Sequence, residues 1–127
     1  MHREFAKIYR KPRKGKPWGI VYLLKANGKN IIKYGASNSL DVTKRKTWAR
    51  RKWVEYQGEN LKFEPIFVIA VKDPFGAECE FKHCLNGYFK IDCEYIVIDH
   101  EFFVVEKTED IPKFLSALAG ITYGRMD

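Results

Sequence analysis

The stretch GIVYLLKANGKNIIKYGAS, residues 19–37, decides the fold because it reads as two strands joined by a tight turn. Both runs are rich in β-branched and aromatic residues, and Asn27-Gly28 between them is a strong signal for a two-residue hairpin turn. A hairpin made only for burial would be apolar on its inner face. This one also carries a lysine and two tyrosines, namely Lys33, Tyr22 and Tyr34.

A two-residue loop would pair Ala26 with Lys29, and would therefore place Tyr22 directly opposite Lys33 and Tyr34 on the other side of the sheet. A three-residue loop or a bulge would exchange Lys33 for Tyr34. We expect the ammonium beside Tyr22 to lower the pKa of the phenol and make it a better proton acceptor. The ammonium can also hold a phosphate oxygen. The structural alternative is a tyrosine that packs along a lysine stem.

Length and composition indicate one globular domain with a basic leader. The chain has 127 residues, of which 46% are hydrophobic and 31% charged, so it can build a core and is not disordered in composition. No apolar run approaches the roughly 20 residues of a membrane helix, and no signal-peptide core is present. We expect a cytosolic, nuclear or viral protein that is not secreted. Residues 1–17 form a basic arm and residues 18–127 the folded domain.

Charge is segregated along the chain. Residues 1–53 hold 16 lysines and arginines and only two acids, whereas the remainder holds seven basic and 14 acidic residues. This split favours a nucleic-acid partner over a membrane surface, because no amphipathic anchor accompanies the charge. DNA is the expected partner and RNA a possible one. The candidate contacts are Arg13, Lys14 and Lys16 in the arm and Lys44, Lys46, Arg50, Arg51 and Lys52 farther on. The tryptophans among them, Trp18, Trp48 and Trp53, would suit stacking on single strands.

The rest of the chain predicts alternating helices and strands. We expect a helix that Ser39 or Asp41 caps and Gly58 ends, a strand over residues 61–71, and a helix that starts at Asp73-Pro74 and carries Phe81, Leu85 and Tyr88 on one face. Two short strands around Asp99-His100 and a last helix between Thr108 and Gly120 complete the chain. This order predicts an α+β fold, a small antiparallel sheet flanked by helices.

The three cysteines allow two interpretations. Cys79 and His83 are one helical turn apart and Cys93 follows, which is conceivable as a zinc site. An odd cysteine count argues against a secreted disulfide framework, and no C-x-x-C pair is present. Buried free cysteines are the commoner explanation.

These residues together resemble the GIY-YIG nuclease family over roughly residues 18–118. Gly19-Ile20-Val21-Tyr22 resembles its first motif, and Lys33-Tyr34-Gly35 resembles the K-I-G form of the second motif in virus-encoded branches. Asp41-x-x-x-Arg45 resembles the start of the family's arginine helix, and Glu101-Phe102-Phe103 resembles a later E-W-F strand. The chain departs from the family in two extra residues before Asp41. Trp48 or Ala49 stands where the family often has histidine or tyrosine on the arginine helix. If Glu78 is the family glutamate, Lys82 stands where a histidine is usual.

The resemblance implies a metal-dependent endonuclease that hydrolyses phosphodiester bonds. Tyr22 and Lys33 would assist the attacking water, Arg45 would stabilise the phosphate charge, and Glu78 would bind Mg²⁺ or Mn²⁺. Glu80 stays open as an alternative to Glu78, although the spacing of Glu78 to later apolar residues fits the family pattern better. Tyr34 stays open as an alternative to Lys33. The other hypotheses are a non-catalytic nucleic-acid-binding module on a degenerate nuclease fold, and a viral inhibitor or adaptor that binds a host protein.

Overall fold

A computed structural model of the chain describes residues 18–87, 91–98 and 101–124. Residues 1–17, with Arg13, Lys14 and Lys16, and the two residues Asp99 and His100 lie outside the described residues. The elements are β1 (Gly19–Ala26), β2 (Ile31–Ser37), α1 (Thr43–Gln57), β3 (Phe63–Val71), α2 (Pro74–Leu85), β4 (Tyr95–Ile98), β5 (Phe102–Val105), a 3-10 turn (Thr108–Asp110) and α3 (Ile111–Tyr123). This order confirms the predicted α+β class. None of the described helices is long and apolar enough to cross a membrane.

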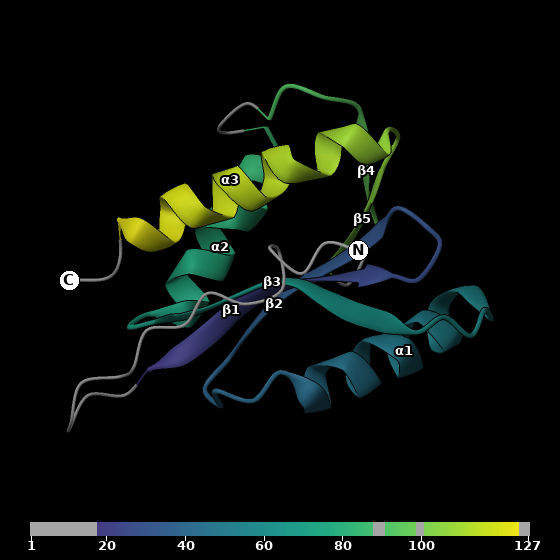
Figure 1. Ribbon diagram of the computed structural model, residues 1–127, viewed down its shortest axis with the longest axis horizontal. Coiled ribbons are helices and arrows are strands. Elements are labelled where there is room, and N and C mark those ends of the chain that lie inside the picture. Colours follow the sequence, from purple (N-terminus) through teal and green to yellow (C-terminus); the bar gives the residue numbers. More distant parts are fainter. Residues whose placement is uncertain (1–17, 88–90, 99–100, 125–127) are drawn as a thin grey trace.

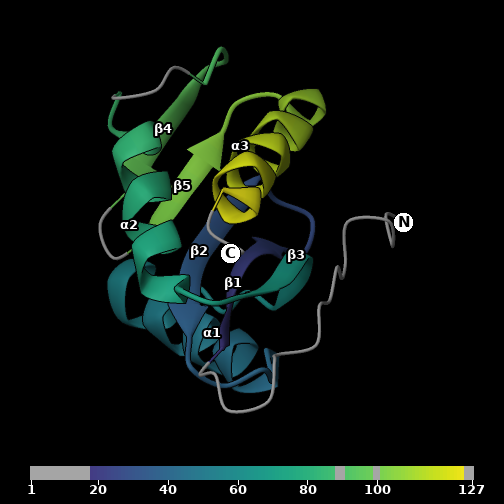
Figure 2. The same cartoon turned by 90° about the vertical axis from the view of Figure 1, so that its left-hand side faces the viewer.

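The strands form one antiparallel sheet in the order β3-β1-β2-β5-β4. Helices cover both of its faces: α2 and α3 lie on one side and α1 on the other (Figures 1 and 2). Side chains alternate along each strand, so β1 and β2 contribute to two separate cores. Val21, Leu23 and Tyr34 face α2 and α3, whereas Ile20, Tyr22 and Leu24 face α1.

The hairpin register differs from the predicted one by two residues. Tyr22 pairs with Gly35 and Leu24 with Lys33, so the connection is longer than Asn27-Gly28. The polar residues 27–30 stay outside the strand pairing, and Gly28 still supplies the left-handed backbone of the turn, with a φ of 77°. A shift of two preserves side-chain parity. Tyr22 and Lys33 therefore share the α1 face as diagonal neighbours, and Tyr34 lies on the opposite face.

Several helix-end predictions are confirmed. Asp73 caps α2, since its carboxylate accepts a hydrogen bond from the Gly76 backbone N–H at 3.1 Å. Gly58 ends α1 in a left-handed conformation with a φ of 67°. The predicted cap of α1 by Ser39 or Asp41 is wrong, because Val42 occupies the cap position and, among the described residues, no side chain caps the helix. The Asp41 carboxylate, one residue before the cap, accepts the Thr43 N–H at 2.9 Å.

Two other helix-end predictions are wrong, and a third falls outside the described residues. α2 ends at Leu85, and Tyr88, which was predicted to share its apolar face, lies outside the described part of the chain. α3 continues through Gly120 to Tyr123, because Leu118 and Ile121 carry its buried face past the glycine. Thr108 does not cap α3: it starts the 3-10 turn, and its side chain hydrogen-bonds the Asn30 side chain at 3.1 Å.

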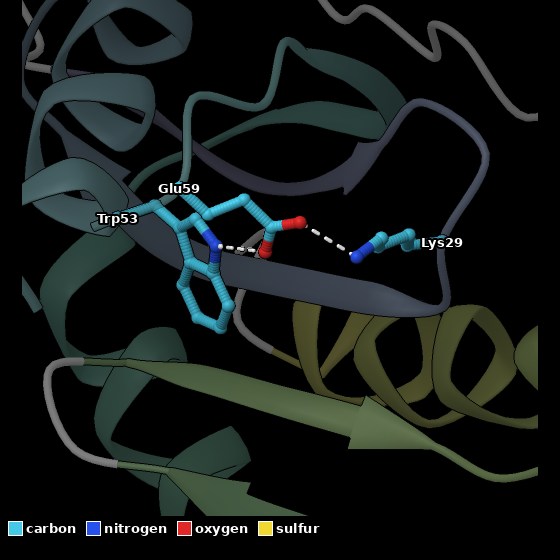
Figure 3. A network of polar contacts seen from close by, with 3 residues as sticks. All are labelled: Lys29, Trp53 and Glu59. Atoms are coloured by element: carbon cyan, nitrogen blue, oxygen red, sulfur yellow. Dashed lines mark hydrogen bonds and ion pairs between the residues drawn. The ribbon is translucent and has the colours of Figure 1, made fainter. Parts of the chain in front are cut away.

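A polar network holds α1 against the hairpin turn (Figure 3). Glu59 follows α1, and its carboxylate accepts hydrogen bonds from the Trp53 indole at 3.2 Å and the Lys29 ammonium at 2.6 Å. The Trp53 ring packs edge-on against Phe102, with ring centroids 5.0 Å apart. The network fixes where α1 lies on the sheet, and with it the positions of the functional candidates on this helix.

Candidate active site

The candidate site lies at the point along β2 where its pairing with β5 ends while its pairing with β1 continues. Strand β5 pairs with β2 only over residues 31–33. The next backbone amide of β2, that of Tyr34, donates instead to the Glu101 carbonyl at 3.0 Å. Glu101 has a φ of 70°, which is uncommon for a residue other than glycine. This backbone conformation places the Glu101 side chain at the sheet edge, between the layers of α1 and α2.

Lys33 is a buried cation at the centre of this edge. Its side chain is only 1% exposed, and its ammonium donates to the Glu101 carboxylate and to the Tyr34 carbonyl, both at 2.7 Å. Burial lowers the pKa of Lys33, while the neighbouring Glu101 charge and hydrogen bond act in the opposite direction. The aromatic rings of Trp48 and Phe102 lie near the ammonium, with their centroids 5.2 and 5.8 Å away.

Tyr22 contradicts the prediction about its acidity. Burial raises the pKa of this phenol, and the charge of Arg45 offsets the increase only partly. The charges of Glu101 and Glu78 add to the increase, and the Lys33 ammonium donates to Glu101 and to the Tyr34 carbonyl and not to the phenol. Tyr22 therefore stays a neutral hydroxyl at ordinary pH and can hold a water molecule through hydrogen bonds, but it is not a good proton acceptor.

The Tyr22 ring lies across the backbone of Gly35 on the paired strand. A Cβ added to Gly35 would clash with the hydroxyl and the ring of Tyr22. The glycine of the second hairpin motif therefore has a physical reason that does not depend on a turn: it makes room for the tyrosine of the first motif.

Arg45 approaches Tyr22 from the first turn of α1. Its charge and a side-chain hydrogen bond act on the Tyr22 hydroxyl. Within the described part of the chain its Nε atom is buried without a hydrogen-bond partner, which is rare for a buried donor. The residue as a whole is only half-buried, so other guanidinium donors remain able to bind an anionic oxygen.

Glu78 reaches the same edge from α2. Burial, together with the charge and the hydrogen bond of Glu101, raises the pKa of Glu78 to about 7. Two carboxyl groups therefore lie side by side, held against the buried ammonium of Lys33. Glu80, the alternative ligand, lies near Cys84 on α2, where its charge acts on the thiol. Tyr34, the alternative to Lys33, has its pKa raised by burial and by the charges of Glu101 and Glu78.

The donor set fits a hard cation held by few protein ligands. Among the described residues no group of three or more histidine, cysteine, aspartate or glutamate side chains forms a metal cage. Magnesium needs no such cage, since it binds through one or two carboxylates together with water and substrate phosphate. Glu78 and Glu101 supply such a pair. The zinc interpretation gains no third ligand: Cys79 and His83 approach at 4.0 Å, and Cys93 does not join them in the described structure.

Most of the predicted nucleic-acid contacts lie on α1. They are outside the cluster, by which we mean Tyr22, Lys33, Arg45, Glu78 and Glu101. Lys46 pairs with Glu64 at 3.0 Å, and Arg50 donates to the Asn60 side chain at 2.6 Å, so both are oriented by the loop and strand that follow the helix. Lys44 and Arg51 are exposed and Lys52 is partly exposed. The stacking prediction is wrong for Trp18 and Trp53, which are buried in the α1 core. Only Trp48 of the three is open to solvent, at 37% exposed.

Sequence reasoning assigned no site role to Glu101. Its motif was recognised as a strand, and the signal that could have revealed more is the acidic residue directly before the apolar run that pairs with β2. Comparisons with protein-family models, curated proteins and solved structures found no match to this chain. The resemblance to GIY-YIG nucleases therefore stays a prediction from motifs.

Proposed function

We propose that this protein is a metal-dependent endonuclease that hydrolyses phosphodiester bonds in DNA. One observation carries the proposal: a buried ammonium, a guanidinium, a neutral phenol and two adjacent carboxyl groups meet at one sheet edge. They come from five separate parts of the chain: β1, β2, α1, α2 and the residue directly before β5. Clusters of ionisable groups with shifted pKa values are typical of functional sites, and the composition of this one matches what a phosphate in hydrolysis requires.

The chain's own residues divide the work as follows. Arg45 binds the scissile phosphate and stabilises the negative charge that grows on it. Tyr22 retains its proton and orients the attacking water through its hydroxyl, which replaces the predicted role as a base. Lys33 holds Glu101 in place and keeps positive charge beside the two carboxylates. Lys33 is a positioning residue, because its buried ammonium already has two protein partners.

A divalent cation, Mg²⁺ or Mn²⁺, would be held by Glu78 with assistance from Glu101. Such a cation polarises phosphate oxygens and lowers the pKa of bound water. The adjacency of the two carboxyl groups supports this assignment, since their mutual repulsion is relieved when a cation binds between them. Glu78 is preferred over Glu80 because the charges of Glu101 and Lys33 both act on the Glu78 carboxyl group.

DNA is the proposed substrate because the basic face of α1 borders the site. Lys44, Lys46, Arg50 and Arg51 would follow the phosphate backbone, which gives affinity without sequence information. RNA presents the same backbone charge, so it belongs in the test. Binding should weaken steeply with salt, as expected when several phosphates are neutralised.

The test is cleavage of duplex, single-stranded and branched DNA and of RNA, each with Mg²⁺ and with EDTA. We expect metal-dependent cleavage of DNA that is lost in Glu78→Gln and Arg45→Ala. Glu80→Gln, on the same helix, is the comparator and should keep most of the activity. Equal losses in the two glutamate variants would contradict the assignment of Glu78.

A non-catalytic nucleic-acid-binding module is the competing candidate. It is favoured by the exposed Trp48 beside basic side chains, a combination that serves binding without chemistry. Wild-type protein that binds DNA but leaves every substrate uncut in Mg²⁺ and in Mn²⁺ would support this module and overturn the nuclease proposal.

A further inference from the structure

A surface cavity adjoins the catalytic cluster. Its volume is about 500 Å³, within the range of small-molecule sites. The walls combine aromatic, basic, amide and aliphatic side chains. They include Trp48, Tyr34, Lys52, Lys82, Asn86 and Val97. Such a mixture is suited to a flat, polar-edged ring that carries negative charge beside it.

Trp48 forms the aromatic wall. It is 37% exposed, whereas Trp53, five residues later on the same helix, is 4% exposed. The ammonium of Lys33, buried beneath, lies 5.2 Å from the Trp48 ring centroid, and that of Lys52 lies 5.1 Å from it. Two cations thus hold an indole that solvent can reach. Lys52 is partly exposed and can exchange this contact for a phosphate.

The cavity and the cluster share a wall. Glu101 lines the cavity and also accepts the Lys33 hydrogen bond at 2.7 Å. Tyr34 lines the cavity too, and the charges of Glu101 and Glu78 help to raise the pKa of its phenol. A group bound in the cavity would therefore lie directly beside the position proposed for the scissile phosphate.

We propose that this cavity seats one unpaired nucleobase next to the cleaved bond, stacked on Trp48. Asn86 offers an amide donor and acceptor to the base edge, and Lys52 and Lys82 neutralise the flanking phosphates. A base within a stacked duplex cannot present its face to an indole, so the ligand must be single-stranded or extruded from the helix. The inference rests on the proposed nuclease function and names its substrate class: DNA with an unpaired base at the cleavage point.

Binding in EDTA tests the cavity without catalysis. The probes are three DNA duplexes of one length: fully paired, with a single-base bulge, and with an abasic bulge. The bulged base is 2-aminopurine, whose fluorescence reports stacking. We expect wild-type protein to bind the base bulge roughly 5- to 100-fold more tightly than the abasic bulge and to quench its fluorescence.

Trp48→Ala should abolish both the preference and the quenching, and Trp48→Phe should keep part of each. Tyr123→Ala removes an exposed aromatic side chain on α3, at the opposite face of the sheet, and should change neither. Circular dichroism and thermal melting check that each variant is folded. Equal affinity of wild type for the base and abasic bulges, or a preference that survives in Trp48→Ala, would overturn the cavity assignment.

Cleavage of the same duplexes in Mg²⁺ separates the two proposals. Cutting of all three at equal rates would overturn the base site and leave the nuclease proposal intact. A Trp48-dependent bulge preference with no cutting would support the base site and overturn the nuclease proposal. Cutting confined to the position next to the bulged base would support both.

Discussion

Each face of the sheet carries its own buried core, but the two faces differ in the polar groups that they bury. On the α2 and α3 face, Phe103 packs against a cluster of rings, with its centroid 4.8 Å from that of Phe114 and 6.2 Å from that of Tyr34. Lys33, which precedes Tyr34 in β2, lies on the α1 face, and its ammonium is buried beneath Trp48 and Phe102. Strand β2 therefore contributes Tyr34 to an aromatic core on one side and a buried charge on the other.

The largest effect should come from the aromatic core. Phe103→Ala removes a fully buried ring and should lower the free energy of unfolding by about 3–5 kcal/mol. Guanidinium denaturation followed by fluorescence measures it. Phe75→Ala removes an exposed ring from α2 and should stay within about 0.5 kcal/mol of wild type. A Phe103→Ala loss below about 1 kcal/mol would mean that this face is not the core that holds the fold together.

Gly35→Ala should have the next largest effect and should act on the other face. The added methyl group would meet the Tyr22 ring, and such overpacking costs about 1–3 kcal/mol. Cleavage should fall further than the loss of folded protein explains, because Tyr22 must leave its position. The matched control is Gly120→Ala within α3, where an added Cβ meets no atom within 4 Å. That variant should be more stable by about 0.5–1 kcal/mol. Equal effects of the two substitutions would contradict the close approach.

The sequence was sufficient to predict the α+β class and the face of the sheet that each hairpin residue occupies. Alternation in β1 and β2 places Tyr22 with Lys33 and apart from Tyr34, whatever even shift the register takes. The register itself was missed, because Asn27-Gly28 is a local signal and the strand pairing is decided by contacts with β3 and β5, which lie far along the chain.

Four residues singled out from the sequence lie together in the structure, but neither Glu101 beside them nor the electrostatics of the group was predicted. Tyr22, Lys33, Arg45 and Glu78 are close enough for their charges to act on one another. The Lys33 ammonium, however, donates to the Glu101 carboxylate and not to the Tyr22 phenol. Glu101 is 68 residues from Lys33 in the chain, and no local pattern links the two. The direction of a pKa shift depends on burial and on third partners, which a sequence does not give for a single residue.

The paired carboxyl groups should give the metal-free protein a pH-dependent stability. Folding raises the pKa of Glu78 to about 7, so the folded state holds this proton more tightly than the unfolded chain does. The contribution is complete below the unfolded pKa of about 4.5 and is lost as the pH rises through about 7. Because Glu78 is partly exposed, we expect a loss of only about 1 kcal/mol.

Denaturation in EDTA at pH values from about 5 to about 8 covers the range that this pKa shift defines. It measures how the free energy of unfolding changes with pH. Glu78→Gln should flatten it relative to wild type, since the amide does not titrate, and Glu80→Gln should retain it. Mg²⁺ should stabilise wild type more at the upper end of the range than at the lower end, because the cation competes with the proton. A wild-type slope that persists in Glu78→Gln would assign the titration to another group.

Lys33→Met should have the smallest effect on stability and a large effect on activity. Burial lowers the pKa of Lys33, which means that folding disfavours its charge at neutral pH. Methionine fills a similar volume without that cost, and Glu101, whose side chain is 38% exposed, regains water when the ammonium is gone. The free energy of unfolding should therefore change by less than about 1 kcal/mol. Cleavage should fall sharply and need more Mg²⁺, because the carboxyl groups keep their proton to higher pH.

Lys33→Arg tests whether the fold needs the buried charge with a substitution that keeps it. Arginine keeps the charge but brings a bulkier group into a side-chain site that is 1% exposed, so it should destabilise the protein more than methionine does. If charge were needed for the fold, the order would be reversed and methionine would be the worse substitution. The measured order of the two unfolding free energies thus decides whether the buried ammonium serves the architecture of the α1 face or the chemistry at its edge.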